Sequence, residues 1–91
     1  MDKDFYVSLP ARGAVRVGGP DRRDFLQGLI SNDVALLDSQ PCVYACLLTP
    51  QGKFLHDFFM TEQGDTITLE CEGAGRALHL HDTLKKFRLR S

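Results

Sequence analysis

The feature that most constrains the fold of this chain is residues 44–61, in which two apolar runs flank a turn-forming tetrapeptide. The tetrapeptide is Thr49-Pro50-Gln51-Gly52. Proline and glycine supply the backbone angles that a tight turn requires, while the flanking runs are apolar and carry several aromatic residues. The stretch therefore predicts an antiparallel hairpin with strands over about 43–49 and 53–61.

Alternation along the second strand separates two neighbouring ionisable residues. Successive side chains of a strand point to opposite faces, so His56 and Asp57 are expected on opposite sides of the sheet. The expected companions of His56 are Phe54, Phe58 and Met60. Those of Asp57 are Leu55, Phe59 and Thr61. A strand that served packing alone would carry neither ionisable residue, so this pair is the main functional lead.

The rest of the chain supplies three more strands and two helices. We expect strands over 5–9 and 14–18 around an Arg12-Gly13 turn, followed by a helix over 21–30 with Asp21 as N-cap. A connector over 34–42 leads to the hairpin. After the hairpin we expect a strand over 66–71, whose core residues include Cys71, and then, after residues 73–75, a helix that runs to about 87. Strands joined by short turns favour antiparallel pairing. The prediction is one α+β domain over residues 1–91, in the order ββαβββα, with both helices packed on one face of the sheet.

Composition narrows the class of protein. The 91 residues are 43% hydrophobic, and the net charge of −1 favours neither nucleic acid nor an anionic membrane as a partner. An odd number of cysteines, three, is typical of a reducing compartment rather than a secreted disulfide scaffold. The acidic N-terminal segment differs from a signal peptide. We therefore expect a soluble intracellular domain without direct nucleic-acid or membrane partners.

Asp57 is the strongest candidate for a binding residue. Apolar neighbours disfavour the charged carboxylate unless a hydrogen-bond donor stabilises it. An N–H-rich heterocycle, a backbone amide or an arginine would each serve. The alternative is that this face is partly exposed and that Asp57 is simply solvated.

The other chemically capable residues have simpler explanations. His56 between two phenylalanines is typical of a core or boundary histidine, and catalysis would require a partner that the sequence does not supply. Cys42, Cys46, Cys71 and the His79-x-His81 pair lack the ligand spacing of a zinc site. We therefore interpret the cysteines as small buried hydrophobic residues and expect no metal site and no catalytic residue.

Two segments carry a resemblance to a known family. FLQGLISNDV at 25–34 and LLTPQGKFLHDF at 47–58 are together similar to the start of YgfZ-type folate-binding proteins, which are related to the aminomethyltransferase (T-protein) of the glycine cleavage system. The resemblance implies part of an aminomethyltransferase-like fold with tetrahydrofolate as cofactor. It also implies a role in iron–sulfur cluster assembly or repair, with iron–sulfur proteins or their assembly machinery as partners, in the cytoplasm or the mitochondrial matrix.

The resemblance also assigns folate-binding residues. Asp57 falls on the second of two acids at the end of the T-protein hairpin, Tyr44 matches a tyrosine that lines the folate pocket, and Asn32 lies in the matching Ser-Asn-Asp segment. His56 replaces the first acid, which speaks against aminomethyl transfer. The alternatives are a folate-dependent aminomethyltransferase and an interaction module with no site of its own.

The length of the chain departs from the family pattern. Family members run to several hundred residues, and the YgfZ branch carries a downstream Lys-Gly-Cys signature that none of the three cysteines matches. Residues 1–91 are therefore expected to be an N-terminal portion, whose exposed apolar surface would favour self-association.

Overall fold

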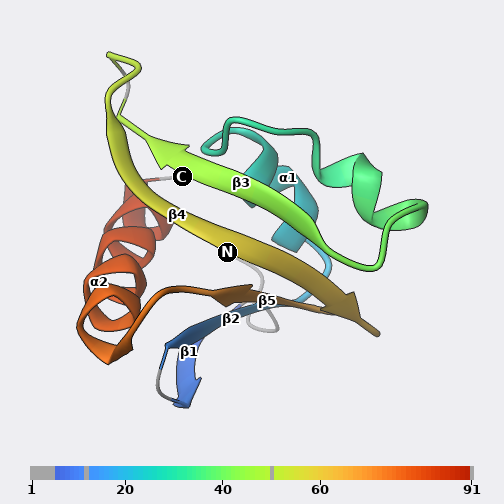
Figure 1. Cartoon of the computed structure of the whole chain (residues 1–91), viewed down its shortest axis with the longest axis horizontal. Helices are drawn as coiled ribbons and strands as arrows, with labels where there is room; N and C mark the ends of the chain where they lie inside the picture. Colours follow the sequence, from blue (N-terminus) through green and yellow to red (C-terminus); the bar gives the residue numbers. More distant parts are fainter. Residues whose placement is uncertain (1–5, 12, 50, 91) are drawn as a thin grey trace.

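The chain folds into a five-stranded antiparallel sheet with two α-helices and a short 3₁₀ helix (Figure 1). The computed structural model describes residues 6–11, 13–49 and 51–90. Its elements are β1 (Tyr6–Ala11), β2 (Ala14–Gly18), α1 (Arg22–Gln27), the 3₁₀ helix η1 (Val34–Asp38), β3 (Val43–Leu48), β4 (Phe54–Gln63), β5 (Thr66–Glu70) and α2 (Ala74–Arg90). This arrangement confirms the predicted α+β class. Phe5, Arg12 and Pro50 of the predicted strand and turns lie outside the described residues.

The sheet has the order β1-β2-β5-β4-β3, with β4 as its longest strand. β5 pairs with residues 59–63 of β4, and Phe59 lies opposite Glu70. Residues 54–58 of β4 therefore continue past the end of β5, where the chain turns into α2. This unequal strand length creates the irregular corner of the sheet that holds the candidate site.

One face of the sheet is covered and the other is not. The buried side chains from strands and helices form one core, with contributions from Val15, Val17, Val43, Ala45, Leu47, Phe58, Met60, Ile67 and Leu69 of the sheet, Leu26 of α1, Val34 of η1, and Ala77, Leu80 and Leu84 of α2. We call this side the covered face. The uncovered face consists of Arg16, Tyr44, Cys46, Asp57, Phe59, Thr68 and Glu70, and within the described chain no helix contributes to the core from that side.

The segment after α1 differs from its prediction. The helix covers six residues rather than the ten expected, because residues 28–30 leave it and Leu29, like the following Ser31, binds the free edge of β3. The amide of Ser31 donates to the carbonyl of Cys46 at 2.9 Å, and the amide of Cys46 donates to Ser31 Oγ at 3.0 Å. Backbone groups on a strand edge need such partners, so protecting the edge of β3 outweighs extending the helix to residue 30.

One expected feature of the α1 region, the helix cap, needs correction. Asp21 precedes α1, but its side chain makes no capping hydrogen bond. Asp33 caps η1 instead, accepting from the amide of Ala35 at 2.9 Å.

Two further predictions about side-chain burial are wrong. A register shift between Leu47 and Leu48 breaks the alternation at the start of β4, so Phe54 is 58% exposed instead of sharing the face of His56. The cysteines are not buried hydrophobic residues, since Cys42 is exposed and Cys46 and Cys71 are half-buried. Cys71 falls beyond the end of β5, where strand alternation no longer applies.

An ionic cluster attaches α1 to the far end of β4. Glu62 accepts from Arg22 Nε at 2.9 Å and from Arg23 Nε at 3.1 Å. Arg22 also donates to the carbonyl oxygens of Gly19 and Gly64, and Arg23 to Asp38 of η1. These hydrogen bonds lower the pKa of the Glu62 carboxyl, and the cluster fixes α1 against the β4–β5 hairpin.

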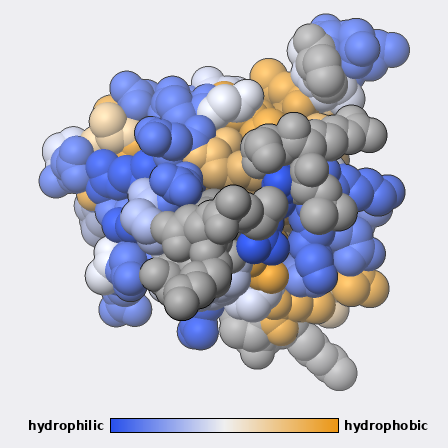
Figure 2. Space-filling view, turned by 180° about the vertical axis from the view of Figure 1, so that it is seen from behind, coloured by the Kyte–Doolittle hydropathy of each residue, from blue (hydrophilic) through white to orange (hydrophobic). Residues whose placement is uncertain are grey.

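The surface is mixed in character. Seen from the side opposite to Figure 1, hydrophilic residues dominate and hydrophobic residues form separate patches (Figure 2). In the part of the chain that the structure describes, no helix combines the length and apolar character that crossing a bilayer requires.

Candidate functional site

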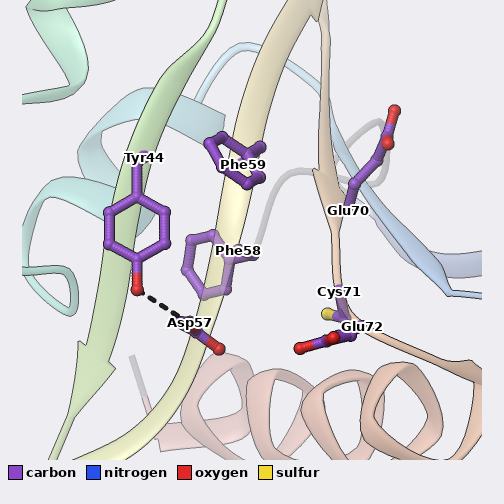
Figure 3. Close-up of a pocket in the computed structure, with 7 residues that line it drawn as sticks. All are labelled: Tyr44, Asp57, Phe58, Phe59, Glu70, Cys71 and Glu72. Carbon is purple, nitrogen blue, oxygen red and sulfur yellow. Dashed lines mark hydrogen bonds between the residues drawn. The ribbon is translucent and has the colours of Figure 1, made fainter.

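A depression of about 360 Å³ opens on the uncovered face, where β5 ends and the chain turns into α2 (Figure 3). Its lining comes from β3, β4 and the segment that ends β5: Tyr44, Asp57, Phe58, Phe59, Glu70, Cys71 and Glu72. Two of the three residues that the sequence assigned to a site, Tyr44 and Asp57, therefore meet in one depression.

Asp57 is held from two sides. The hydroxyl of Tyr44 donates to Asp57 Oδ2 at 2.7 Å, and Arg76 Nη1 of α2 lies 3.7 Å from Asp57 Oδ1. The hydrogen bond to the carboxylate raises the pKa of Tyr44 above its ordinary value, so the phenol remains a donor. The side chain of Asp57 is 34% exposed. The carboxylate is thus oriented by the protein while one edge remains open to a ligand.

Two aromatic rings form a wall beside this carboxylate. Tyr44 and Phe59 are directly opposite each other on β3 and β4, with ring centroids 5.2 Å apart and planes inclined at 58°. Both residues are about half exposed. Exposed aromatic faces next to a polar anchor are typical of sites for planar ligands, because the ring supplies contact area and the anchor fixes orientation.

The remaining lining residues were not predicted from the sequence. Glu70 and Glu72 add carboxylates, and Cys71 contributes a thiol whose pKa is raised by burial and by the nearby charge of Asp57. That thiol is protonated near neutral pH and acts as a small neutral wall rather than a nucleophile. Counting outward from the β4–β5 turn pairs Glu70 with Phe59, so this part of the lining had a signal in the sequence.

Asn32 lies beside the site rather than in it. Its Nδ2 donates to the backbone carbonyl of Tyr44 at 3.1 Å, and its Oδ1 accepts from the amide of Asp33 at 2.8 Å. Asn32 therefore contacts the free edge of β3 and does not line the depression.

His56 lies on the covered face, as alternation predicted. It is 6% exposed, and its Nε2 is 2.7 Å from Nδ1 of His79 on α2. Burial is the main cause of its lowered pKa, followed by the nearby His79 and Arg76. The interpretation as a core histidine is confirmed, and α2 supplies the hydrogen-bond partner that the sequence did not reveal.

The described residues contain no group of three or more histidine, cysteine, aspartate or glutamate side chains arranged to hold a metal ion. The depression itself presents several groups that can contact a ligand. It offers an oriented carboxylate, a guanidinium at its rim and an aromatic wall.

Comparisons with known proteins relate the chain to two groups. No family model matches it. The iron–sulfur cluster assembly factor IBA57 homolog of Mycosarcoma maydis is 40% identical over 101 residues, covering 93% of this chain and 24% of that protein. The mouse (Mus musculus) iron–sulfur cluster assembly factor IBA57 is 35% identical, covering 88% of this chain and 26% of the relative.

A shorter match leads to a second group. An aminomethyltransferase of Bordetella petrii is 43% identical over 54 residues, which is 54% of this chain and 15% of the enzyme. The chain spans about a quarter of the length of the IBA57 relatives that it matches. The chain is therefore similar to the iron–sulfur cluster assembly factors over most of its length and to an aminomethyltransferase over about half of it.

Proposed function

We propose that this chain is the tetrahydrofolate-binding portion of a YgfZ-like protein that assists iron–sulfur cluster assembly or repair. The observation that carries the proposal is the position of Asp57, oriented by the Tyr44 hydroxyl and open toward a depression with an aromatic wall. The pyrimidinone part of the reduced pterin of folate is planar, and the pterin is rich in N–H donors and of a size suited to such a depression. Asp57 would accept from the pterin N–H groups, and Tyr44 and Phe59 would pack on the ring.

Asn32 has a supporting role in this proposal. Its hydrogen bond to the carbonyl of Tyr44 holds β3 at the residue that carries the phenol. We therefore expect Asn32 to act by positioning Tyr44 rather than by contacting folate.

The names of the relatives support the cellular part of the proposal. The relatives of Mycosarcoma maydis, Neurospora crassa and Mus musculus are described as mitochondrial iron–sulfur cluster assembly factors. We extend this role, the assembly machinery as partner and the mitochondrial location to the protein to which this chain belongs. The chain would be the N-terminal portion of an aminomethyltransferase-like fold. Its exposed Tyr44 and Phe59 would promote self-association when the portion is isolated.

Binding of tetrahydrofolate to the 91-residue chain tests the proposal. Isothermal titration should show saturable binding that is at least tenfold weaker in Asp57→Asn, because the neutral amide loses a charge-assisted acceptor. Asp24→Asn is the matched control, since Asp24 is an exposed acid on α1 outside the depression. Equal affinity of Asp57→Asn and the unsubstituted chain would refute the assignment.

The matches to aminomethyltransferases favour a second candidate, a folate-dependent aminomethyltransferase. In that case Asp57 would orient tetrahydrofolate for attack on an aminomethyl group. Because His56 faces the core and pairs with His79, it contributes nothing to the depression. Glycine-cleavage activity of the complete protein would decide for this candidate, and its absence would decide against it.

A further inference from the structure

The rim of the depression presents an acceptor and a donor side by side. Tyr44 occupies Oδ2 of Asp57, so Oδ1 is the oxygen that remains for a ligand. Arg76 Nη1 lies 3.7 Å from that oxygen, which is longer than a hydrogen bond. Among the described residues, Arg76 makes its ion pair with Asp57 alone. Both groups therefore keep hydrogen-bonding capacity for a third partner.

The contact between Asp57 and Arg76 is easily rearranged. The arginine side chain is 57% exposed and that of the aspartate 34%. An ion pair with this much solvent contact contributes little to stability, so a ligand edge can come between the two groups at small cost. Because Arg76 lies in the first turn of α2 and Asp57 on β4, helix and strand fix the backbone positions from which the two side chains reach the ligand.

We infer that Arg76 is a specificity-determining residue of this site, which together with Asp57 recognises a ring edge bearing an N–H next to a carbonyl oxygen. The inference rests on the proposed function and names the part of the ligand that the site recognises. In tetrahydrofolate the 4-oxo group of the pterin lies between two N–H groups, on N3 and N5. Either N–H can donate to Asp57 Oδ1 while the 4-oxo oxygen accepts from Arg76.

The same arrangement selects against a close analogue. In a 4-amino-substituted tetrahydrofolate the carbonyl oxygen is replaced by an amino group, which is itself a donor and faces the Arg76 donor. A site built to bond a polar group discriminates strongly against a ligand that lacks it, because its own polar atoms are left unpaired. Glu70 and Glu72 line the depression as well, but carboxylates cannot donate to the carbonyl, so they cannot supply this preference.

Titration of tetrahydrofolate and of its 4-amino analogue into four forms of the chain tests the inference: unsubstituted, Arg76→Ala, Asp57→Asn and the control Lys85→Ala. Lys85 is an exposed cation on the same helix, so it matches the charge change without touching the depression. We expect the unsubstituted chain to bind the 4-oxo ligand about tenfold more tightly than the 4-amino ligand. Arg76→Ala should lower the affinity for the 4-oxo ligand about tenfold and the affinity for the 4-amino ligand less than about threefold. Lys85→Ala should preserve the ratio.

Two results would overturn the inference and leave the proposed function standing. In one, Arg76→Ala weakens the binding of both ligands by the same factor, which would mean that Arg76 acts only through its charge and not through a hydrogen bond to the carbonyl. In the other, it changes neither affinity while Asp57→Asn still abolishes binding. If the unsubstituted chain binds neither ligand, or Asp57→Asn binds as tightly as the unsubstituted chain, the proposed function fails as well. Circular dichroism of Arg76→Ala checks that the exposed substitution leaves the fold intact.

Discussion

The two faces of the sheet differ in burial, and neighbouring residues of β4 contribute to both. On the covered face, Phe58 is 2% exposed and packs in the core beneath the helices. On the uncovered face, Phe59 is 51% exposed and stands beside Tyr44. Because consecutive side chains point in opposite directions, one step along the chain separates a ring packed in the core from a ring that is half exposed. Substitutions on the two faces should therefore be separable by experiment.

The sharpest test of this separation exchanges each phenylalanine for alanine. Phe58→Ala should lower the free energy of unfolding by about 3–5 kcal/mol, because it leaves a cavity in the core. Phe59→Ala removes a half-exposed ring and should cost less than about 1 kcal/mol. Urea denaturation followed by circular dichroism measures both. Similar losses from the two substitutions would show that the uncovered face also supports the fold.

The ionic cluster of the covered side gives the next largest effect. Glu62→Gln leaves the guanidinium groups of Arg22 and Arg23 without their shared carboxylate and should cost about 1–2 kcal/mol, less than a fully buried pair because both arginines retain solvent contact. Asp38→Asn is the control, since Asp38 pairs with Arg23 at the exposed edge of the same cluster. A Glu62→Gln protein as stable as the Asp38→Asn protein would mean that the cluster does not fix α1.

A smaller effect is expected on the uncovered face, at Gly18. The ring of Tyr6 lies over this glycine, its hydroxyl is 3.0 Å from Thr66 Oγ1, and a Cβ atom at position 18 would collide with the ring. Gly18→Ala should displace the ring and cost about 1 kcal/mol. Gly75→Ala on α2 meets no neighbour, so it should be neutral or slightly stabilising. Thermal unfolding of the two variants should diverge, and coincident curves would contradict the packing of Tyr6.

The smallest predicted effect is a dependence of stability on pH that arises from the covered face. The pKa of His56 is lowered from 6.5, so below pH 6.5 the unfolded chain binds a proton that the folded chain resists. Stability attributable to this residue is therefore present above pH 6.5 and falls as the pH decreases toward the lowered value. We expect a decrease of a few degrees in the unfolding midpoint between pH 7.5 and 5.5, which should be smaller in His56→Gln and unchanged in His81→Gln. An equal decrease of the unfolding midpoint in all three proteins would show that the pH dependence arises from other residues.

Alternation and turn chemistry were enough to predict much of this molecule. The period of two along 56–60 placed His56 and Asp57 on opposite faces, and the structure has them there. The α+β class followed from the same local signals. Structural features that depend on tertiary contacts could not be predicted from local sequence signals. Leu29 fits a helical pattern, but its carbonyl accepts from the edge of β3 instead. Phe54 is exposed beside a register shift that only the pairing of β3 with β4 reveals.

The candidate site divides in the same way. Asp57 was found from the sequence because strand alternation places a carboxylate among apolar neighbours, and the family resemblance marks both Tyr44 and Asp57. Cys71 and Arg76 were not found as site residues, because they reach the depression only where β5 ends short of β4 and α2 begins. The partner of His56 was missed for a related reason, since His79 comes from a helix that no periodicity places over β4.

The central claim is that ligand binding belongs to the uncovered face. Mapping backbone amide chemical shifts of the labelled chain during titration with tetrahydrofolate tests it directly. We predict that the perturbed amides cluster at Tyr44, Asp57, Phe59 and residues 70–72, and that the perturbations disappear in Asp57→Asn. Shifts concentrated instead around a second depression, whose lining includes Leu29, Leu48 and Phe87, or shifts that persist in Asp57→Asn, would contradict the account.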